Sequence, residues 1–125
     1  YDTVQAMLRH DGFFKAGVSA SGNHDFRVDK AGWNELWMGW PMTEHWEQQS
    51  NYTNVERLKG KLLLAHGELD SNVHPSATLR LVDKLIKAKK DFDLLIMPKM
   101  GHVLDANPYF VEKRWQFFIE HLQLQ

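Results

Sequence analysis

The chain has 125 residues, of which 43% are hydrophobic and 25% charged, and its 15 basic and 16 acidic residues leave a net charge of −1. This composition is typical of one globular domain, and the near-zero charge gives no basic surface to attract nucleic acid or an anionic membrane. No apolar run reaches the roughly 20 residues that span a bilayer, and without cysteine the chain has no disulfide, thiolate metal site or cysteine nucleophile.

Hydrophobic periodicity and turn signals predict alternating helices and strands. Residues 22–53 form an irregular, aromatic-rich segment, and Pro75 and Pro108 each fit the first turn of a helix. In chain order we expect a helix over 2–10, a strand over 13–20, a helix over 32–40, a strand over 61–66, a helix over 75–89, a strand over 92–97 and a helix from 108 onward.

The two later helices carry apolar residues at helical spacing, which predicts one buried face for each. The predicted faces are Leu79, Val82, Leu85 and Ile86 in the first, and Val111, Trp115, Phe118, Ile119 and Leu122 in the second. Strands separated by helices favour a parallel sheet with right-handed crossovers. The predicted fold class is therefore α/β, a parallel sheet with flanking helices.

Two residues with catalytic potential follow predicted strands. Asp70 comes shortly after the apolar run 62–65, and His102 comes shortly after the strand over 92–97. In a parallel sheet the loops after the carboxyl ends of the strands lie at one edge, where catalytic groups collect. An Asp–His pair at this edge would hold a general base in one tautomer, whereas a loop aspartate and a turn histidine are the common alternative.

The segment LLLAHGELDSNVHP at residues 62–75, followed by a helix, a short strand and Gly101-His102, resembles the C-terminal end of a prolyl oligopeptidase family catalytic domain, in the dipeptidyl peptidase IV-like branch. In that family the pattern His-Gly-x-x-Asp-x-Asn-Val-His carries the triad aspartate, and a Gly-His or Asp-His pair about 32 residues later carries the triad histidine. The resemblance implies an α/β-hydrolase fold and assigns these roles to Asp70 and His102.

The resemblance also implies that the nucleophile lies outside this chain. The family's serine lies in a Gly-x-Ser-x-Gly-Gly-Tyr elbow, and Tyr1-Asp2-Thr3 resembles the residues just after the second glycine, about three residues after the serine. On this alignment residues 1–125 are a partial α/β-hydrolase domain that lacks the N-terminal strands, the serine, the oxyanion hole and the family's β-propeller. The chain alone is then expected to be inactive.

The sequence contains one substitute for the elbow, at residues 17–22. The position two after Ser19 is Ser21 rather than glycine, and neither serine opens a convincing helix. We therefore interpret this stretch as a strand end built of small residues.

Other polar residues around the candidate pair have simpler interpretations. His66 is expected to be a packed residue at a strand end and His74 a neighbour of a helix cap. Together with Asp70 and His102 they are metal-ligating residue types, but no helix carries two histidines at ligand spacing, so we expect no metal and no cofactor. Glu68 is the alternative orienting acid, and the resemblance favours Asp70.

The resemblance implies substrate-binding positions as well. Asn72 and Val73 resemble residues that border the first two substrate residues in dipeptidyl peptidases, with loop architecture as the alternative. Trp33 resembles an aromatic wall of the primary specificity pocket, with a core position as the alternative. The neighbouring position, where the family has tyrosine, is Asp29 here, which argues against assuming a preference for proline.

Three functions follow from these observations. The first is that the longer parent protein is a serine peptidase that hydrolyses short peptides and releases dipeptides from an amino terminus. The second keeps the fold and the triad but acts on esters or acylated amino acids. The third is a non-catalytic association unit, since a parallel sheet without its early strands has an exposed edge through which copies can pair.

Overall fold

The computed structural model describes residues 1–27 and 30–122. Asp29 lies outside the described residues. In chain order the elements are α1 (Asp2–Arg9), β1 (Ala16–Ala20), α2 (Ala31–Met38), α3 (Glu44–Gln48), the 3₁₀ helix η1 (Val55–Arg57), β2 (Lys61–Gly67), α4 (Ser76–Lys87), β3 (Asp93–Met97) and α5 (Pro108–Leu122). All seven predicted elements are present with shifted ends, while α3 and η1 lie in or beside the segment predicted to be irregular.

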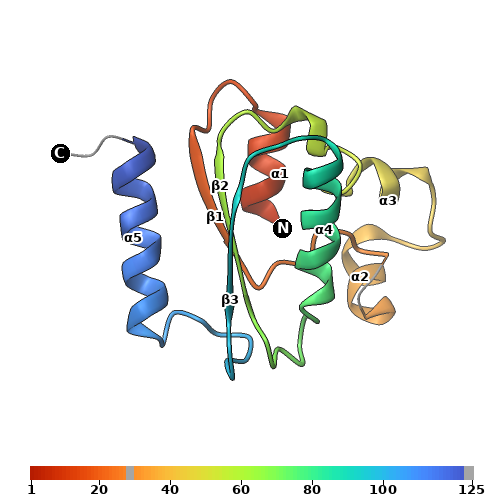
Figure 1. Ribbon diagram of the computed structural model, residues 1–125. Helices are drawn as coiled ribbons and strands as arrows, with labels where there is room; N and C mark the ends of the chain where they lie inside the picture. Colours follow the sequence, from red (N-terminus) through yellow and green to blue (C-terminus); the bar gives the residue numbers. More distant parts are fainter. Residues whose placement is uncertain (28–29, 123–125) are drawn as a thin grey trace.

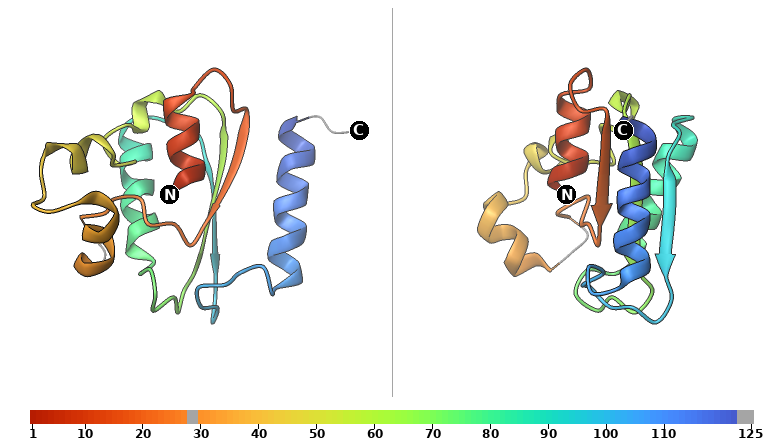
Figure 2. Two further views of the ribbon diagram at one scale, coloured as in Figure 1. Left: turned by 180° about the vertical axis from the view of Figure 1, so that it is seen from behind. Right: turned by 90° about the vertical axis from the view of Figure 1, so that its left-hand side faces the viewer.

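The three strands form a parallel sheet in the order β1-β2-β3, which confirms the predicted α/β class. Helices α1 and α4 cover one face of the sheet and α5 covers the other, with α2 and α3 outside the α1 and α4 layer (Figures 1 and 2). Because β2 is central and covered on both faces, its residues from Leu62 to Gly67 are all buried. The carboxyl ends of the strands meet at one edge, the lower one in Figure 1.

Alternation along β2 divides the core between the two faces. Leu62 and Leu64 pack with α1 and α4, in the larger apolar cluster. Ala65 faces the opposite side and packs with Met97, Leu104 and Phe110, at the start of α5. His66 continues the alternation toward α4, which bears on the site described below.

The predicted buried face of α4 is partly wrong. Leu81 and Leu85 are buried, at 0% and 1% exposure, whereas Leu79 and Ile86 are 49% and 61% exposed. The inward face instead follows Ala77, Leu81 and Leu85, four residues apart. Apolar residues occur on more than one side of this helix, and only contact with the sheet selects the buried side.

The predicted face of α5 is wrong for the same reason. Phe110 and Phe117, seven residues apart, are the buried residues of this helix, and Trp115 and Ile119 are 60% and 51% exposed. The first strand also begins later than predicted, at Ala16, because the chain still turns at residues 11–13.

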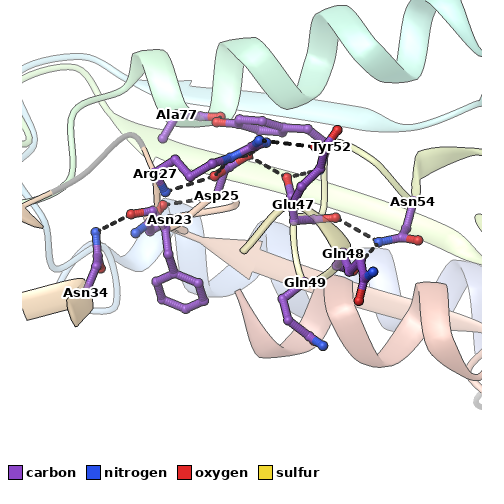
Figure 3. A network of polar contacts seen from close by, with 12 residues as sticks. Asn23, Asp25, Arg27, Asn34, Glu47, Gln48, Gln49, Tyr52, Asn54 and Ala77 are labelled. Atoms are coloured by element: carbon purple, nitrogen blue, oxygen red, sulfur yellow. Dashed lines mark hydrogen bonds and ion pairs between the residues drawn. The ribbon is translucent and has the colours of Figure 1, made fainter. Parts of the chain in front are cut away.

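A polar network holds the irregular segment between β1 and β2 (Figure 3). Asp25 is buried, and its carboxylate accepts hydrogen bonds from Arg27 Nε at 2.9 Å and Ser50 Oγ at 2.7 Å. Tyr52 donates its hydroxyl hydrogen to the Ala77 carbonyl in α4, at 2.8 Å. Burial raises the pKa of Asp25, but the hydrogen bonds from Arg27 and Ser50 outweigh burial and hold this pKa below its usual value. The network attaches the segment to α4.

No helix among residues 1–27 and 30–122 is long and apolar enough to cross a lipid bilayer. Strand β3 is an edge of the sheet, and its Leu94 and Ile96 are 39% and 37% exposed. Self-association through a sheet edge stays a prediction.

We expect Leu81→Ala to lower the free energy of unfolding by about 2–5 kcal/mol, because it leaves a cavity between α4 and the sheet. Leu79→Ala is the matched control on the same helix, and it should cost about 1 kcal/mol or less because Leu79 is half exposed. Urea unfolding followed by circular dichroism measures both changes. A larger loss in Leu79→Ala than in Leu81→Ala would contradict this packing and favour the face predicted from the sequence.

Candidate active site

Asp70 and His102 meet at the carboxyl edge of the sheet. Asp70 follows β2, His102 follows β3, and the distance from His102 Nδ1 to Asp70 Oδ2 is 2.8 Å. An ionised carboxylate can only accept a hydrogen bond, so Nδ1 carries the proton and Nε2 is the basic nitrogen. Asp70 has a fully buried side chain, while that of His102 is 39% exposed. An imidazole held in this way by a carboxylate can act as a general base.

Both oxygens of the Asp70 carboxylate accept hydrogen bonds. Oδ1 accepts the backbone N–H groups of Asn72 and Val73, each at 2.9 Å. Oδ2 accepts His102 and also lies 3.1 Å from Nε2 of His66. Burial raises the pKa of Asp70, but the hydrogen bonds from His102, Val73 and Asn72 outweigh burial and keep this pKa below its usual value. Asp70 is therefore ionised at neutral pH.

Backbone contacts fasten the loop after β2 to the loop after β3. Glu68 N donates to the Met97 carbonyl at 3.0 Å, and Leu69 N donates to the Met100 carbonyl at 2.9 Å. A Cβ on Gly67 would collide with the carbonyl oxygens of Met100 and Gly101, so this approach requires glycine. The Glu68 carboxylate accepts the Lys99 backbone N–H at 3.0 Å. Glu68 therefore joins the two loops, and it is Asp70 that contacts the imidazole.

The other histidines and the serines have separate places. Nδ1 of His74 accepts the Ser76 backbone N–H at 3.1 Å, at the start of α4. The Ser21 hydroxyl donates to the His102 backbone carbonyl at 2.6 Å rather than to the imidazole, and Ser19 is buried. Across residues 1–27 and 30–122, no three His, Asp or Glu side chains are grouped to hold a metal ion.

A cleft of about 490 Å³ lies beside His102. Trp33, Val73 and Phe26 contribute apolar lining, and Asn72 and Lys30 contribute polar lining. Trp33 is 57% exposed, so it is not a core residue. The structure thus brings Trp33, Asn72 and Val73 together around one cleft with His102.

Lys30 and Phe26 are among the cleft residues that were not singled out from the sequence. Lys30 Nζ donates a hydrogen bond to Asn72 Oδ1 at 2.6 Å. The backbone carbonyl of Phe26 accepts a hydrogen bond from Nδ2 of the buried Asn34 at 2.7 Å. Because lysine only donates, the oxygen of the Asn72 amide must face Lys30, and the NH2 group faces the other way. Neither residue has a sequence signal, since each lies in the irregular segment and is placed by tertiary contacts.

The sequence model of the prolyl oligopeptidase family matches residues 1–125. Dipeptidyl peptidase family member 1 of Caenorhabditis elegans is 32% identical over 108 residues, which are 86% of this chain and 13% of that protein. Inactive dipeptidyl peptidase 10 of Rattus norvegicus is 29% identical over 128 residues, covering 98% of this chain and 16% of that protein.

Solved structures agree with the sequence comparison. A putative dipeptidyl aminopeptidase IV from Bacteroides ovatus superposes with a TM-score of 0.89 at 26% identity, over 95% of this chain and 17% of that one. Dipeptidyl peptidase 4 of Porphyromonas gingivalis gives 0.86 at 26% identity, over 95% of this chain and 18% of that one. The chain therefore spans less than a fifth of each relative described.

We expect Asp70→Asn to flatten the dependence of stability on acid pH. Because the native pKa of Asp70 is lowered, its stabilisation is complete above about pH 4, near the unfolded value, and is lost as the pH falls further, through the native pKa. Urea unfolding at several pH values below neutral measures the free energy of unfolding.

Asp91→Asn is the control, because Asp91 is 87% exposed and its ion pair with Lys61 is long, at 3.4 Å. This variant should keep the acid slope of the unsubstituted chain. An Asp70→Asn curve as steep as that of the unsubstituted chain would contradict the linkage.

Proposed function

Because the chain belongs to the prolyl oligopeptidase family, we propose that Asp70 and His102 are two members of a Ser–His–Asp triad in a serine peptidase that cleaves short peptides. The hydrogen bond from His102 Nδ1 to Asp70 Oδ2, at 2.8 Å, is the observation that carries the proposal. It fixes the tautomer in which Nε2 is free to accept a proton. The dipeptidyl peptidase names of the relatives support release of dipeptides from an amino terminus.

The nucleophilic serine of the proposed triad comes from residues that precede Tyr1 in the longer protein. The likeness of Tyr1-Asp2-Thr3 to the end of a nucleophile elbow supports this assignment. The N-terminal end of α1 also faces the edge where the strands' carboxyl ends lie (Figure 1), which is how a helix after an elbow is oriented. The 125-residue chain alone is then expected to leave peptides uncut.

In the proposed reaction His102 Nε2 takes the serine hydroxyl proton while the serine oxygen attacks the scissile carbonyl carbon. His102 then gives this proton to the leaving amine, and an acyl-enzyme remains. Water, activated by the same nitrogen, releases the acid and restores the serine. Asp70 stays ionised throughout and stabilises the imidazolium, a role that its lowered pKa supports.

Asn72, Val73 and Trp33 are the proposed substrate-binding residues. The NH2 group of Asn72 is turned away from Lys30, so it is free to donate to a substrate carbonyl. Val73 and Trp33 line the cleft with apolar surface that suits an uncharged side chain of the substrate.

Hydrolysis of esters or acylated amino acids is the second candidate. Among the described residues the cleft has no carboxylate side chain to pair with a free peptide amino group. This lining suits a substrate whose amino group is blocked. The fold and the triad would serve both reactions.

We expect a longer protein that includes the elbow to hydrolyse chromogenic dipeptide substrates and to be labelled by a fluorophosphonate. His102→Ala should lower its kcat by about 10⁴- to 10⁶-fold, because the general base is lost. His10→Ala, at an exposed position on another part of the chain, is the matched control and should keep full activity.

The same assay distinguishes the candidates by comparing free and N-acylated substrates. Cleavage of only the N-acylated compounds would favour the second candidate. An elbow-containing protein that is neither labelled nor active on any of these substrates would contradict both.

In the longer protein, Asn72→Ala should raise KM for dipeptide substrates by about threefold to tenfold, the worth of one hydrogen bond between neutral groups. The value of kcat should change less, because this contact binds the substrate and the transition state alike. Steady-state kinetics measure both. Ser71→Ala, at the exposed neighbouring position, should leave KM unchanged, and an unaltered KM in Asn72→Ala would remove Asn72 from the binding site.

A further inference from the structure

His66 is a second histidine on the carboxylate that His102 uses. Its side chain is fully buried, and its Nε2 lies 2.7 Å from the Val73 carbonyl oxygen and 3.1 Å from Asp70 Oδ2. A carbonyl oxygen can only accept, so Nε2 of His66 carries a hydrogen. The interpretation of His66 as merely a packed strand-end residue is therefore incomplete.

The Nε2–H group of His66 ties β2 to the loop that follows it. Val73 N donates to Asp70 Oδ1 at 2.9 Å, and the carbonyl of the same residue accepts His66. His66 thus donates to the main chain of the loop and lies against the second oxygen of the carboxylate, at 3.1 Å. The Asp70 side chain cannot rotate without breaking contacts on both of its oxygens.

The orientation of His66 is itself fixed by rigid elements. Its Nδ1 lies 2.7 Å from the hydroxyl of Thr78, which is 1% exposed in the first turn of α4. The hydroxyl can donate to Nδ1, which satisfies both ring nitrogens of a neutral imidazole. His66 also belongs to β2 and pairs in the sheet with Ile96. The ring is therefore locked by the sheet on one side and by α4 on the other.

We propose that His66 is a positioning residue that holds the Asp70 carboxylate in the rotamer that fixes the tautomer of His102. This inference rests on the proposed function only for the catalytic role of the Asp70–His102 pair. Nearby titratable groups are Asp70, His102, Lys30 beside the cleft and His24 in the loop after β1. Burial lowers the pKa of His24 to about 3, so His24 stays neutral near neutral pH.

The test uses two amide variants that each imitate one nitrogen of the ring. In His66→Gln the amide reaches the Nε2 position and keeps the contacts to Val73 and Asp70. In His66→Asn the shorter amide reaches only the Nδ1 position and keeps the Thr78 contact. The imidazole ¹⁵N chemical shifts of neutral His102 in the 125-residue chain report which ring nitrogen carries the proton.

We expect the His102 proton on Nδ1 in the unsubstituted chain and in His66→Gln, and its transfer largely to Nε2 in folded His66→Asn. In the longer protein His66→Asn should lower kcat about 10- to 100-fold and leave KM unchanged, because small misplacements of catalytic groups slow the reaction to this extent. The value of kcat should recover in His66→Gln. If the Asn variant does not fold, His66→Leu replaces it.

An Nδ1 proton retained in folded His66→Asn, or lost in folded His66→Gln, would overturn the inference. Because the ¹⁵N measurement needs no turnover, it decides the role of His66 even where the longer protein proves to have no hydrolase activity. If the longer protein is inactive but the ¹⁵N shifts place the His102 proton as expected in each variant, the result counts against the proposed function and not against the role of His66.

Discussion

The buried carboxylate of Asp70 is the constraint on which the candidate site depends. A charge removed from water is tolerated only when hydrogen bonds and opposite charge replace its solvent. Three N–H groups donate to it here, from the backbone of Asn72 and Val73 and from the ring of His102, and Nε2 of His66 lies 3.1 Å from Oδ2. These groups come from β2, from the loop after it and from the loop after β3, so one carboxylate joins three parts of the molecule.

The parallel sheet makes this convergence possible. Strands β2 and β3 are direct neighbours and end at the same edge, so residues that are distant in sequence come within hydrogen-bonding distance there. The same alternation that sends Leu62 and Leu64 toward α4 sends His66 to that face as well. Core packing and site geometry are thus consequences of one strand register.

The order of elements and the juxtaposition of Asp70 and His102 could be predicted from sequence because both follow from local pattern and from sheet topology. The buried faces of α4 and α5 could not, since each helix has apolar residues on several sides and the sheet selects one. The contribution of Lys30 to the cleft could not be predicted from the sequence either. It depends on a contact with Asn72, 42 residues away, across a segment without periodic structure.

The loops after β2 and β3 meet at Gly67, and the contacts that join them there are distinct from the contact between Asp70 and His102. The loops are fastened by main-chain groups and by Glu68, none of which involves the ring of His102. These contacts do not depend on the ring at position 102, whereas any side chain at position 67 displaces one loop from the other. The join between the two loops is therefore more sensitive to a single methyl group added at Gly67 than to the loss of the His102 ring.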